Sequence, residues 1–128
     1  MKSTCPQVPF VELVQPSTMG WLILPSLCQE AQMYVVAAQY YAKEGKADEI
    51  AAILKQMIPI SRAEPWCLLY LINRSLDDPR KFLLYEQYQD RAGYDAHMAT
   101  EPFKANILGK VVPMLESRVR DFYEVIEP

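Results

Sequence analysis

One histidine and one carboxylate stand out as residues that could perform acid–base chemistry. His97 is the only histidine of the chain, so it is the only imidazole with an ordinary pKa near neutrality. Glu86 lies in an apolar and aromatic run that precedes it. A carboxylate bound to an imidazole fixes the ring tautomer and raises its basicity, and such a base can remove a proton from a phenol or an enol. We expect Glu86 and His97 to form a catalytic pair; the alternative is that they only tie a helix to a sheet.

Four further side chains are candidates for binding a substrate. Tyr70 and Tyr88 carry hydroxyls that can hold a substrate carbonyl, provided that their strand faces point at the helices. Asn73 and Arg74 end an apolar run and can bind an anionic substrate at the sheet edge. Each also has an ordinary structural interpretation: the tyrosines as core or interface residues, and the Asn–Arg pair as the end of a strand.

Cysteine and histidine usage argues against a metal site or a disulfide framework. The three cysteines, Cys5, Cys28 and Cys67, are an odd number without CxxC spacing, and only one histidine accompanies them. Zinc sites need several such ligands at characteristic spacings. We therefore expect no metal and no set of structural disulfides.

Composition and charge exclude several classes of partner. The chain has 128 residues, 51% of them hydrophobic and 23% charged, as in one globular domain. Its 13 Lys and Arg oppose 16 Asp and Glu, and the basic residues do not cluster. Nucleic-acid binding normally needs a basic stripe that neutralises phosphates. We expect no nucleic-acid partner.

The apolar segments are too short to cross a membrane. The apolar run at residues 21–24 stops at Pro25, and the longer run at 66–72 has only seven residues, whereas a helix that spans a bilayer needs about 20. A secretion signal that ends at Cys28 is disfavoured, because Leu27 stands where a lipoprotein cleavage site needs a small residue. We expect no membrane contact and a cytoplasmic location.

From Met33 onward the residue pattern predicts alternating strands and helices. Strands are predicted at 33–41, 66–73, 81–89 and 117–127. A helix follows Lys46, and Pro59 ends or kinks it; its apolar stripe is Ile50, Ile53, Leu54, Met57 and Ile58. A short helix at 91–98 has Asp90 as N-cap, and a second piece that starts at 100–102 carries Phe103, Ile107, Leu108, Val111 and Leu115. This β-α-β-β-α-β order predicts an α+β, ferredoxin-like fold with an antiparallel sheet.

The predicted strands also indicate a homodimer. The runs VVAA, CLLYLI and FLLY are apolar on both faces of the sheet, yet a chain of this size has no third layer to cover the second face. Sheet-to-sheet packing of two copies about a two-fold axis solves this. The proline-rich segment 1–32 lacks helix or strand periodicity, so we divide the chain into an N-terminal arm (1–32) and a domain (33–128).

Three segments of this domain resemble the antibiotic biosynthesis monooxygenase superfamily. They are MYVVAAQYY, SRAEPWCLLY and FLLYEQYQDRAGYDAHMATEPF. The most specific features are Glu86 two residues before an aromatic, a short helix that carries His97, and a Pro-Phe pair at 102–103. The sequence departs from the family at Tyr88, where tryptophan is usual, and at the Glu64-Pro65-Trp66-Cys67 turn, where a Glu-Pro-Gly-Cys turn is typical.

The resemblance implies a dimeric α+β barrel and a reaction without a cofactor. Some members of the superfamily oxidise small aromatic or quinol-type substrates with O2, which implies a monooxygenase with His97 as base, Glu86 as its orienting residue and Tyr70 and Tyr88 as positioning groups. An isomerase-like enzyme on a small phosphorylated carbonyl compound, as in autoinducer-2 processing, is one alternative, and Arg74 in the pocket would favour it. A non-catalytic dimeric module that binds a small molecule is the other.

Overall fold

The computed structural model describes residues 33–127, and Met33–Glu124 form one compact unit. The predicted arm lies outside the described residues. In chain order the elements are β1 (Tyr34–Ala42), α2 (Ala47–Arg62), β2 (Cys67–Arg74), β3 (Lys81–Tyr88), α3 (Arg91–Met98), the π-helix η3 (Phe103–Val111), the 3₁₀ turn η4 (Val112–Met114) and β4 (Leu115–Glu124). This order confirms the predicted α+β, ferredoxin-like fold.

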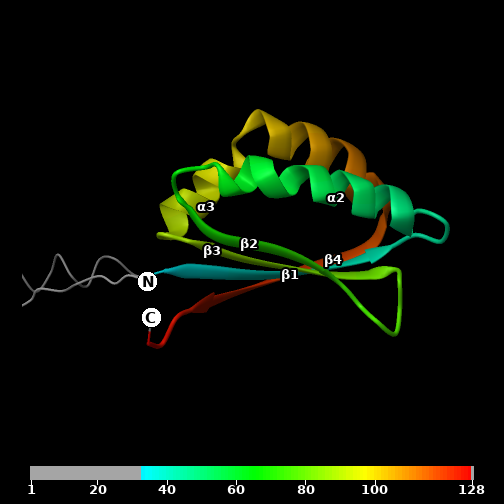
Figure 1. Cartoon of the computed structure of the whole chain (residues 1–128), viewed down its shortest axis with the longest axis horizontal. Helices are drawn as coiled ribbons and strands as arrows, with labels where there is room; N and C mark the ends of the chain where they lie inside the picture. The colour runs from blue at the N-terminus through cyan, green and yellow to red at the C-terminus, as the bar shows by residue number, and fades with distance from the viewer. Residues whose placement is uncertain (1–32, 128) are drawn as a thin grey trace, which may run out of the picture. The chain divides into compact units, whose positions relative to one another are not determined.

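The four strands form one antiparallel sheet in the order β2-β3-β1-β4, and the helices lie over one of its faces (Figure 1). In the register of the sheet, Val36 of β1 pairs with Glu86 of β3 and with Phe122 of β4. Because side chains alternate between faces along a strand, the register places residues of all four strands under the helices. This helix-covered face includes Val36, Ala38, Tyr40, Tyr70, Phe82, Leu84, Glu86, Tyr88, Arg118, Arg120 and Phe122.

The hydrophobic core lies between the helices and the helix-covered face. Ile50, Leu54 and Met57 of α2 are fully buried, and Ile53 and Ile58 pack partly buried against them. The predicted apolar stripe of this helix is therefore confirmed. Burial of such a stripe removes apolar surface from water, which contributes about 25 cal/mol per Å².

The sequence predicted that Pro59 ends or kinks the first helix, and the structure shows that it does not end it. α2 continues past Pro59 to Arg62, and the carbonyl of Pro59 accepts a hydrogen bond from the amide of Ala63 at 3.1 Å. Proline removes one donor, but its own carbonyl stays available to the next turn. The buried face also continues from Met57 to Ser61, so packing against the core favours the helical path.

The last helix and the last strand meet earlier than predicted. Leu115, placed on the helical stripe by the sequence, is the first residue of β4. The helical path ends at η4, which contains Pro113, and β4 ends at Glu124 rather than at Glu127. Leu108, also assigned to the stripe, is exposed. The wider turn of the π-helix rotates residues away from the 3.6-residue spacing on which the prediction rested.

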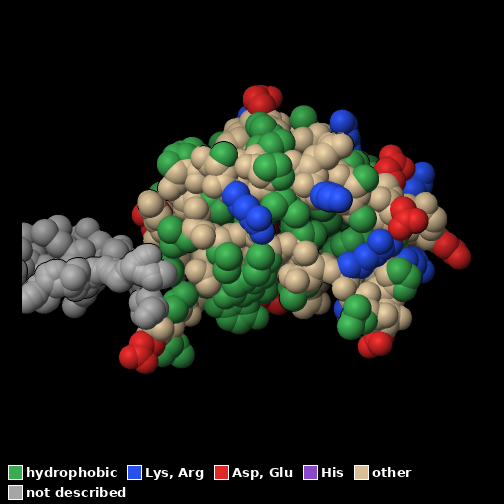
Figure 2. Space-filling view, viewed as in Figure 1, with side chains coloured by type: hydrophobic (Ala, Val, Ile, Leu, Met, Phe, Trp, Pro, Cys, Tyr) green, Lys and Arg blue, Asp and Glu red, His purple; other side chains and the backbone are tan. Residues whose placement is uncertain are grey.

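The opposite face of the sheet carries large apolar side chains that remain partly in contact with solvent. Leu71 and Leu83 are 38% and 39% exposed, and Val119 and Tyr123 are 52% and 55% exposed. Figure 2 shows hydrophobic side chains gathered along the side of the sheet that faces away from the helices. Two apolar faces with helices on only one of them is the pattern that the sequence predicted.

Candidate active site

The short helix α3 places His97 against the sheet. Its N-cap, Asp90, accepts a hydrogen bond from the amide of Gly93 at 2.9 Å, which confirms the predicted cap and satisfies one free donor of the first turn. Gly93 faces the loop before β2, where an added Cβ would lie 3.0 Å from the Cβ of Trp66. The helix therefore approaches closely enough to bury both Tyr94 and His97.

His97 forms a hydrogen bond with Glu64, a residue of the loop between α2 and β2. The His97 Nδ1 to Glu64 Oε1 distance is 2.9 Å, and only 1% of the His97 surface is exposed. The same Oε1 accepts a hydrogen bond from Nε1 of Trp66 at 3.0 Å. A carboxylate next to Nδ1 favours the tautomer that carries its proton there, which leaves the lone pair on Nε2.

Burial keeps this histidine in its neutral form. It lowers the pKa of His97 from the ordinary value of 6.5, and the hydrogen bond and charge of Glu64 oppose that effect. A neutral imidazole is the form that can accept a proton. His97 therefore has the protonation state of a base at neutral pH.

Aromatic rings surround the His97 imidazole. Ring centroids lie at 5.0 Å for Phe103, 5.3 Å for Tyr88, 5.9 Å for Tyr70 and 6.3 Å for Tyr94. Tyr70 and Tyr88 both belong to the helix-covered face, as their proposed role requires. These rings bury the imidazole in largely apolar surroundings.

Glu86 does not hold His97, so the predicted Glu86–His97 hydrogen bond is wrong. Glu86 instead accepts a hydrogen bond from the hydroxyl of Tyr88 at 2.7 Å. The two residues are two apart on β3 and share a face, which brings the hydroxyl to the carboxylate. The single carboxylate that contacts His97 within residues 33–127 is Glu64.

Glu86 is nevertheless an unusual carboxyl. Burial raises the pKa of Glu86 from 4.5 to about 7, while the Tyr88 hydrogen bond and the Arg118 charge act in the opposite direction. Such a group exchanges a proton near neutrality. It forms a second proton-binding group beside His97, because the ring of Tyr88 contacts the imidazole and its hydroxyl contacts the carboxylate.

Asn73 and Arg74 lie away from this group, at the end of β2. Asn73 donates from its side-chain amide to the carbonyl of Leu83 at 3.1 Å. Arg74 pairs with Asp48 at 2.9 Å and donates to the carbonyl of Pro79 at 2.7 Å. Both side chains stabilise the ends of β2 and α2, so the structure does not bring them to the histidine.

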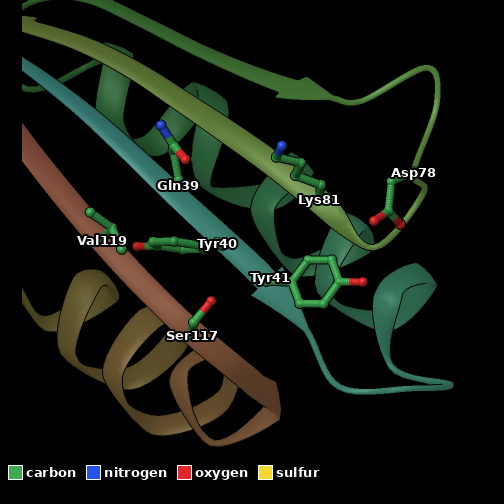
Figure 3. A pocket seen from close by; sticks show the side chains of 7 residues that line it. All are labelled: Gln39, Tyr40, Tyr41, Asp78, Lys81, Ser117 and Val119. Carbon is green, nitrogen blue, oxygen red and sulfur yellow. The ribbon is translucent and has the colours of Figure 1, made fainter.

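One cavity among the described residues is lined by residues other than His97. It lies on the face of the sheet that points away from the helices (Figure 3). Its volume is about 250 Å³, and its lining residues are Gln39, Tyr40, Tyr41, Asp78, Lys81, Ser117 and Val119. The substrate-binding role predicted for Tyr70 and Tyr88 called instead for a site on the helix-covered face.

Glu64 is the site residue that the sequence analysis missed. Its only signal was the Glu-Pro turn before the second strand, which we interpreted as a turn motif without chemistry. Glu64 and His97 are far apart in the sequence, and Glu64 lies outside any helix or strand. Periodicity therefore could not show that the two side chains meet.

Comparison with known proteins places the chain in a family. The family model described as antibiotic biosynthesis monooxygenase matches residues 33–107, more than half of the chain. The chain belongs to the antibiotic biosynthesis monooxygenase family. The matched region contains Glu64, Glu86 and His97, together with β3 and α3, which hold Glu86 and His97.

Relatives and solved structures of similar proteins agree with this antibiotic biosynthesis monooxygenase fold. A Shewanella oneidensis protein of known structure is 32% identical, with 74% of this chain and 92% of that chain covered and a TM-score of 0.70. A Nitrosomonas europaea protein described as a candidate antibiotic biosynthesis monooxygenase is 28% identical, with 75% and 92% covered and a TM-score of 0.71. An uncharacterised Synechocystis protein is 31% identical over 83 residues, which span 62% of this chain and 56% of that relative.

Antibiotic biosynthesis monooxygenase proteins are typically dimeric. Within residues 33–127, no three His, Cys, Asp or Glu side chains come together as a possible metal site. None of the helices in that range has the length and apolar character needed to cross a bilayer.

Proposed function

We propose that this chain is a cofactor-independent monooxygenase that oxidises a small aromatic or quinol-type substrate with O2. The observation that carries the proposal is the buried Glu64–His97 pair inside a group of aromatic rings. His97 would act as the base, and Glu64 would hold it as a positioning residue in the tautomer that exposes the Nε2 lone pair. This assignment replaces Glu86 as the orienting residue.

The reaction balances without an external reductant. His97 removes a proton from an activated C–H or O–H group, and the resulting anion passes electrons to O2. A C–O bond forms, and cleavage of the O–O bond leaves a carbonyl on the substrate. One atom of O2 stays in the product and the other leaves as water with the two hydrogens that the substrate loses. The substrate thus supplies every electron that O2 accepts.

Tyr70 and Tyr88 would position the substrate ring, and Glu86 would exchange a proton with solvent or substrate. Both tyrosine rings contact the His97 imidazole. The Tyr88 hydroxyl already donates to Glu86, so protonation of Glu86 would release this hydroxyl as a donor for a developing oxyanion. A general base of this kind typically contributes a factor of about 10² to 10⁴ in rate.

We propose that two copies form the dimeric barrel by packing the opposite faces of their sheets together. The exposed Leu71, Leu83 and Val119 on that face support this arrangement. The partner is thus a second copy of the chain, in addition to the small-molecule substrate. A cytoplasmic location stays a prediction.

The isomerase-like alternative loses the feature that would have favoured it. It called for Arg74 in the pocket to bind a phosphate. Arg74 is instead the last residue of β2, where it pairs with Asp48 of α2. A non-catalytic module remains the outcome to test against, because the Glu64–His97 pair would also fasten α3 to the loop before β2.

Oxygen consumption tests the proposal. Wild-type protein and a His97→Ala variant are incubated with a panel of quinols and anthrones in an oxygen electrode. We expect His97→Ala to lose about 10²-fold or more in rate and Glu64→Gln to lose about tenfold. Lys55→Gln, on the exposed side of α2, serves as the control. The proposal fails if no substrate consumes oxygen faster than buffer, or if His97→Ala equals the wild type.

A further inference from the structure

Two arginines lie side by side on the edge strand of the helix-covered face. Arg118 and Arg120 are two residues apart on β4, where they pair with Tyr40 and Ala38 of β1. In the structure the guanidinium groups turn toward the same layer as Glu86 and Tyr94.

The donors of Arg118 are only partly used. Its guanidinium carbon lies 5.6 Å from the centroid of the Tyr40 ring. Its Nε is buried and has no hydrogen-bond partner among residues 33–127. A buried donor without a partner loses its hydrogen bond to water and gains nothing in exchange, which is unfavourable. An acceptor that enters from outside the chain would remove that penalty.

Arg120 binds neutral partners instead of a carboxylate. Its Nη1 donates to the Tyr94 hydroxyl at 3.0 Å and approaches the Met98 sulfur at 3.5 Å. Within the described part of the chain, neither Arg118 nor Arg120 forms an ion pair. Arg74 and Arg80, at the far end of the sheet, each form one. Burial raises the pKa of Glu86, and the charges of Arg118 and Arg120 both oppose that effect, so this carboxyl lies near the pair. Neither guanidinium forms an ion pair with it within residues 33–127.

Aromatic rings continue from this pair toward the histidine. The Phe122 ring, next on the same face of β4, lies 5.7 Å from the Tyr94 ring and 5.6 Å from the Tyr34 ring. Phe122 is 44% exposed, so one side of this group is open to an incoming ring. Tyr94 in turn stacks on His97 at 6.3 Å. The arginine pair and the proposed base are thus neighbours of one tyrosine.

We propose that Arg118 and Arg120 bind the deprotonated oxygen of a phenolic substrate whose ring packs against Phe122. Two guanidinium groups suit an oxyanion because charge-assisted hydrogen bonds are about twice as strong as neutral ones. The aromatic neighbours select a phenolate over a phosphate, which offers no ring to stack. This inference rests on the proposed function, and it names the substrate class as phenols acidic enough to ionise beside two arginines.

Binding of 4-nitrophenol tests the site without any turnover. Its phenolate is yellow and its phenol is not, so absorbance reports both binding and the pKa of the bound probe. With the full chain, we expect the bound probe to ionise at lower pH than the free probe. Arg118→Gln and Arg120→Gln should each weaken binding by about tenfold or more, and Lys55→Gln, an equal loss of charge on α2, should leave it unchanged.

Three controls keep the result decisive. Arg120 is exposed, so Arg120→Gln remains informative if Arg118→Gln fails to fold, as judged by circular dichroism. Arg118→Lys keeps the charge without Nε and should bind more weakly than wild type but better than Arg118→Gln. Inorganic phosphate should compete poorly.

The inference is overturned if wild type does not bind the probe, if Arg120→Gln binds as well as wild type, or if phosphate binds with the same arginine dependence and displaces the probe. Its failure is separate from failure of the proposed function. Arginine-dependent binding without oxygen consumption would reject only the monooxygenase, and oxygen consumption unaffected by Arg120→Gln would reject only the oxyanion site.

Discussion

Removing the buried charge of Glu86 should abolish one component of the pH dependence of stability. Glu86 is 5% exposed and accepts the Tyr88 hydroxyl. Glu86→Gln keeps the shape and an acceptor for that hydroxyl but cannot ionise. The wild-type protein must ionise this carboxyl in a buried position as the pH rises, and the variant does not.

The sign and the magnitude follow from the pKa of Glu86, which burial raises from 4.5 to about 7. Below pH 4.5 the carboxyl is protonated in both the folded and the unfolded chain, so it has no effect. Between pH 4.5 and 7 only the unfolded chain ionises, and the free energy of unfolding falls. The shift of the Glu86 pKa from 4.5 to about 7 corresponds to a loss of about 3 kcal/mol in the free energy of unfolding. This loss is complete above pH 7.

Urea unfolding of both proteins from pH 4.5 to pH 8 measures this directly, at one fixed protein concentration because a dimer makes stability depend on concentration. The free energy of unfolding of Glu86→Gln, minus that of wild type, should rise by about 3 kcal/mol across this range. Taking the difference cancels the opposite contribution of His97, whose lowered pKa removes stability as the pH falls below 6.5. Glu44→Gln, which removes an exposed carboxylate, should change the difference by only a few tenths of a kcal/mol. A difference between Glu86→Gln and wild type that is constant with pH would refute the reasoning.

Three further substitutions test the packing around the site. Gly93→Ala places a Cβ 3.0 Å from that of Trp66 and should destabilise the fold by about 1 to 3 kcal/mol in thermal unfolding; an unchanged midpoint would contradict the close approach of α3. Tyr88→Phe removes the donor to Glu86, so the upper end of the pH range over which stability falls should move upward, and an unmoved upper end would show that this hydrogen bond does not favour the carboxylate. Leu71→Lys puts a charge on the opposite face of the sheet and should yield monomers in light scattering, whereas an undiminished dimer would reject the sheet-to-sheet interface.

The sequence predicted the elements well where local signals were strong. The stripe of α2 and the Asp90 cap of α3 both depend on neighbours within one or two helical turns. Alternation along β3 correctly placed Glu86 and Tyr88 on one face. Signals failed where packing overrode local preference, as at Pro59, which stays inside a helix because the buried face continues past it to Ser61.

The site could be predicted only in part, because its main contact joins distant segments. The composition identified His97 without ambiguity, since the chain has one histidine. The partner of His97 comes from a loop, and neither helical nor strand periodicity constrains where a loop side chain points. We chose Glu86 because strand alternation predicts the face of the sheet on which its side chain lies. Alternation does not determine which polar group on that face the carboxylate contacts. Tyr88, two residues along, meets it first.

The most direct test of the central claim is the protonation state of His97, which nitrogen-15 NMR reads for each ring nitrogen. In wild type at pH 7 we predict a neutral ring with the proton on Nδ1, facing Glu64, and an unprotonated Nε2. The Glu64→Gln variant should show more of the other tautomer, because an amide can donate to Nδ1. A proton on Nε2 in the wild-type protein at pH 7, whether as the other tautomer or as imidazolium, would leave no lone pair on the outer nitrogen and would contradict the assignment of His97 as a base held by Glu64.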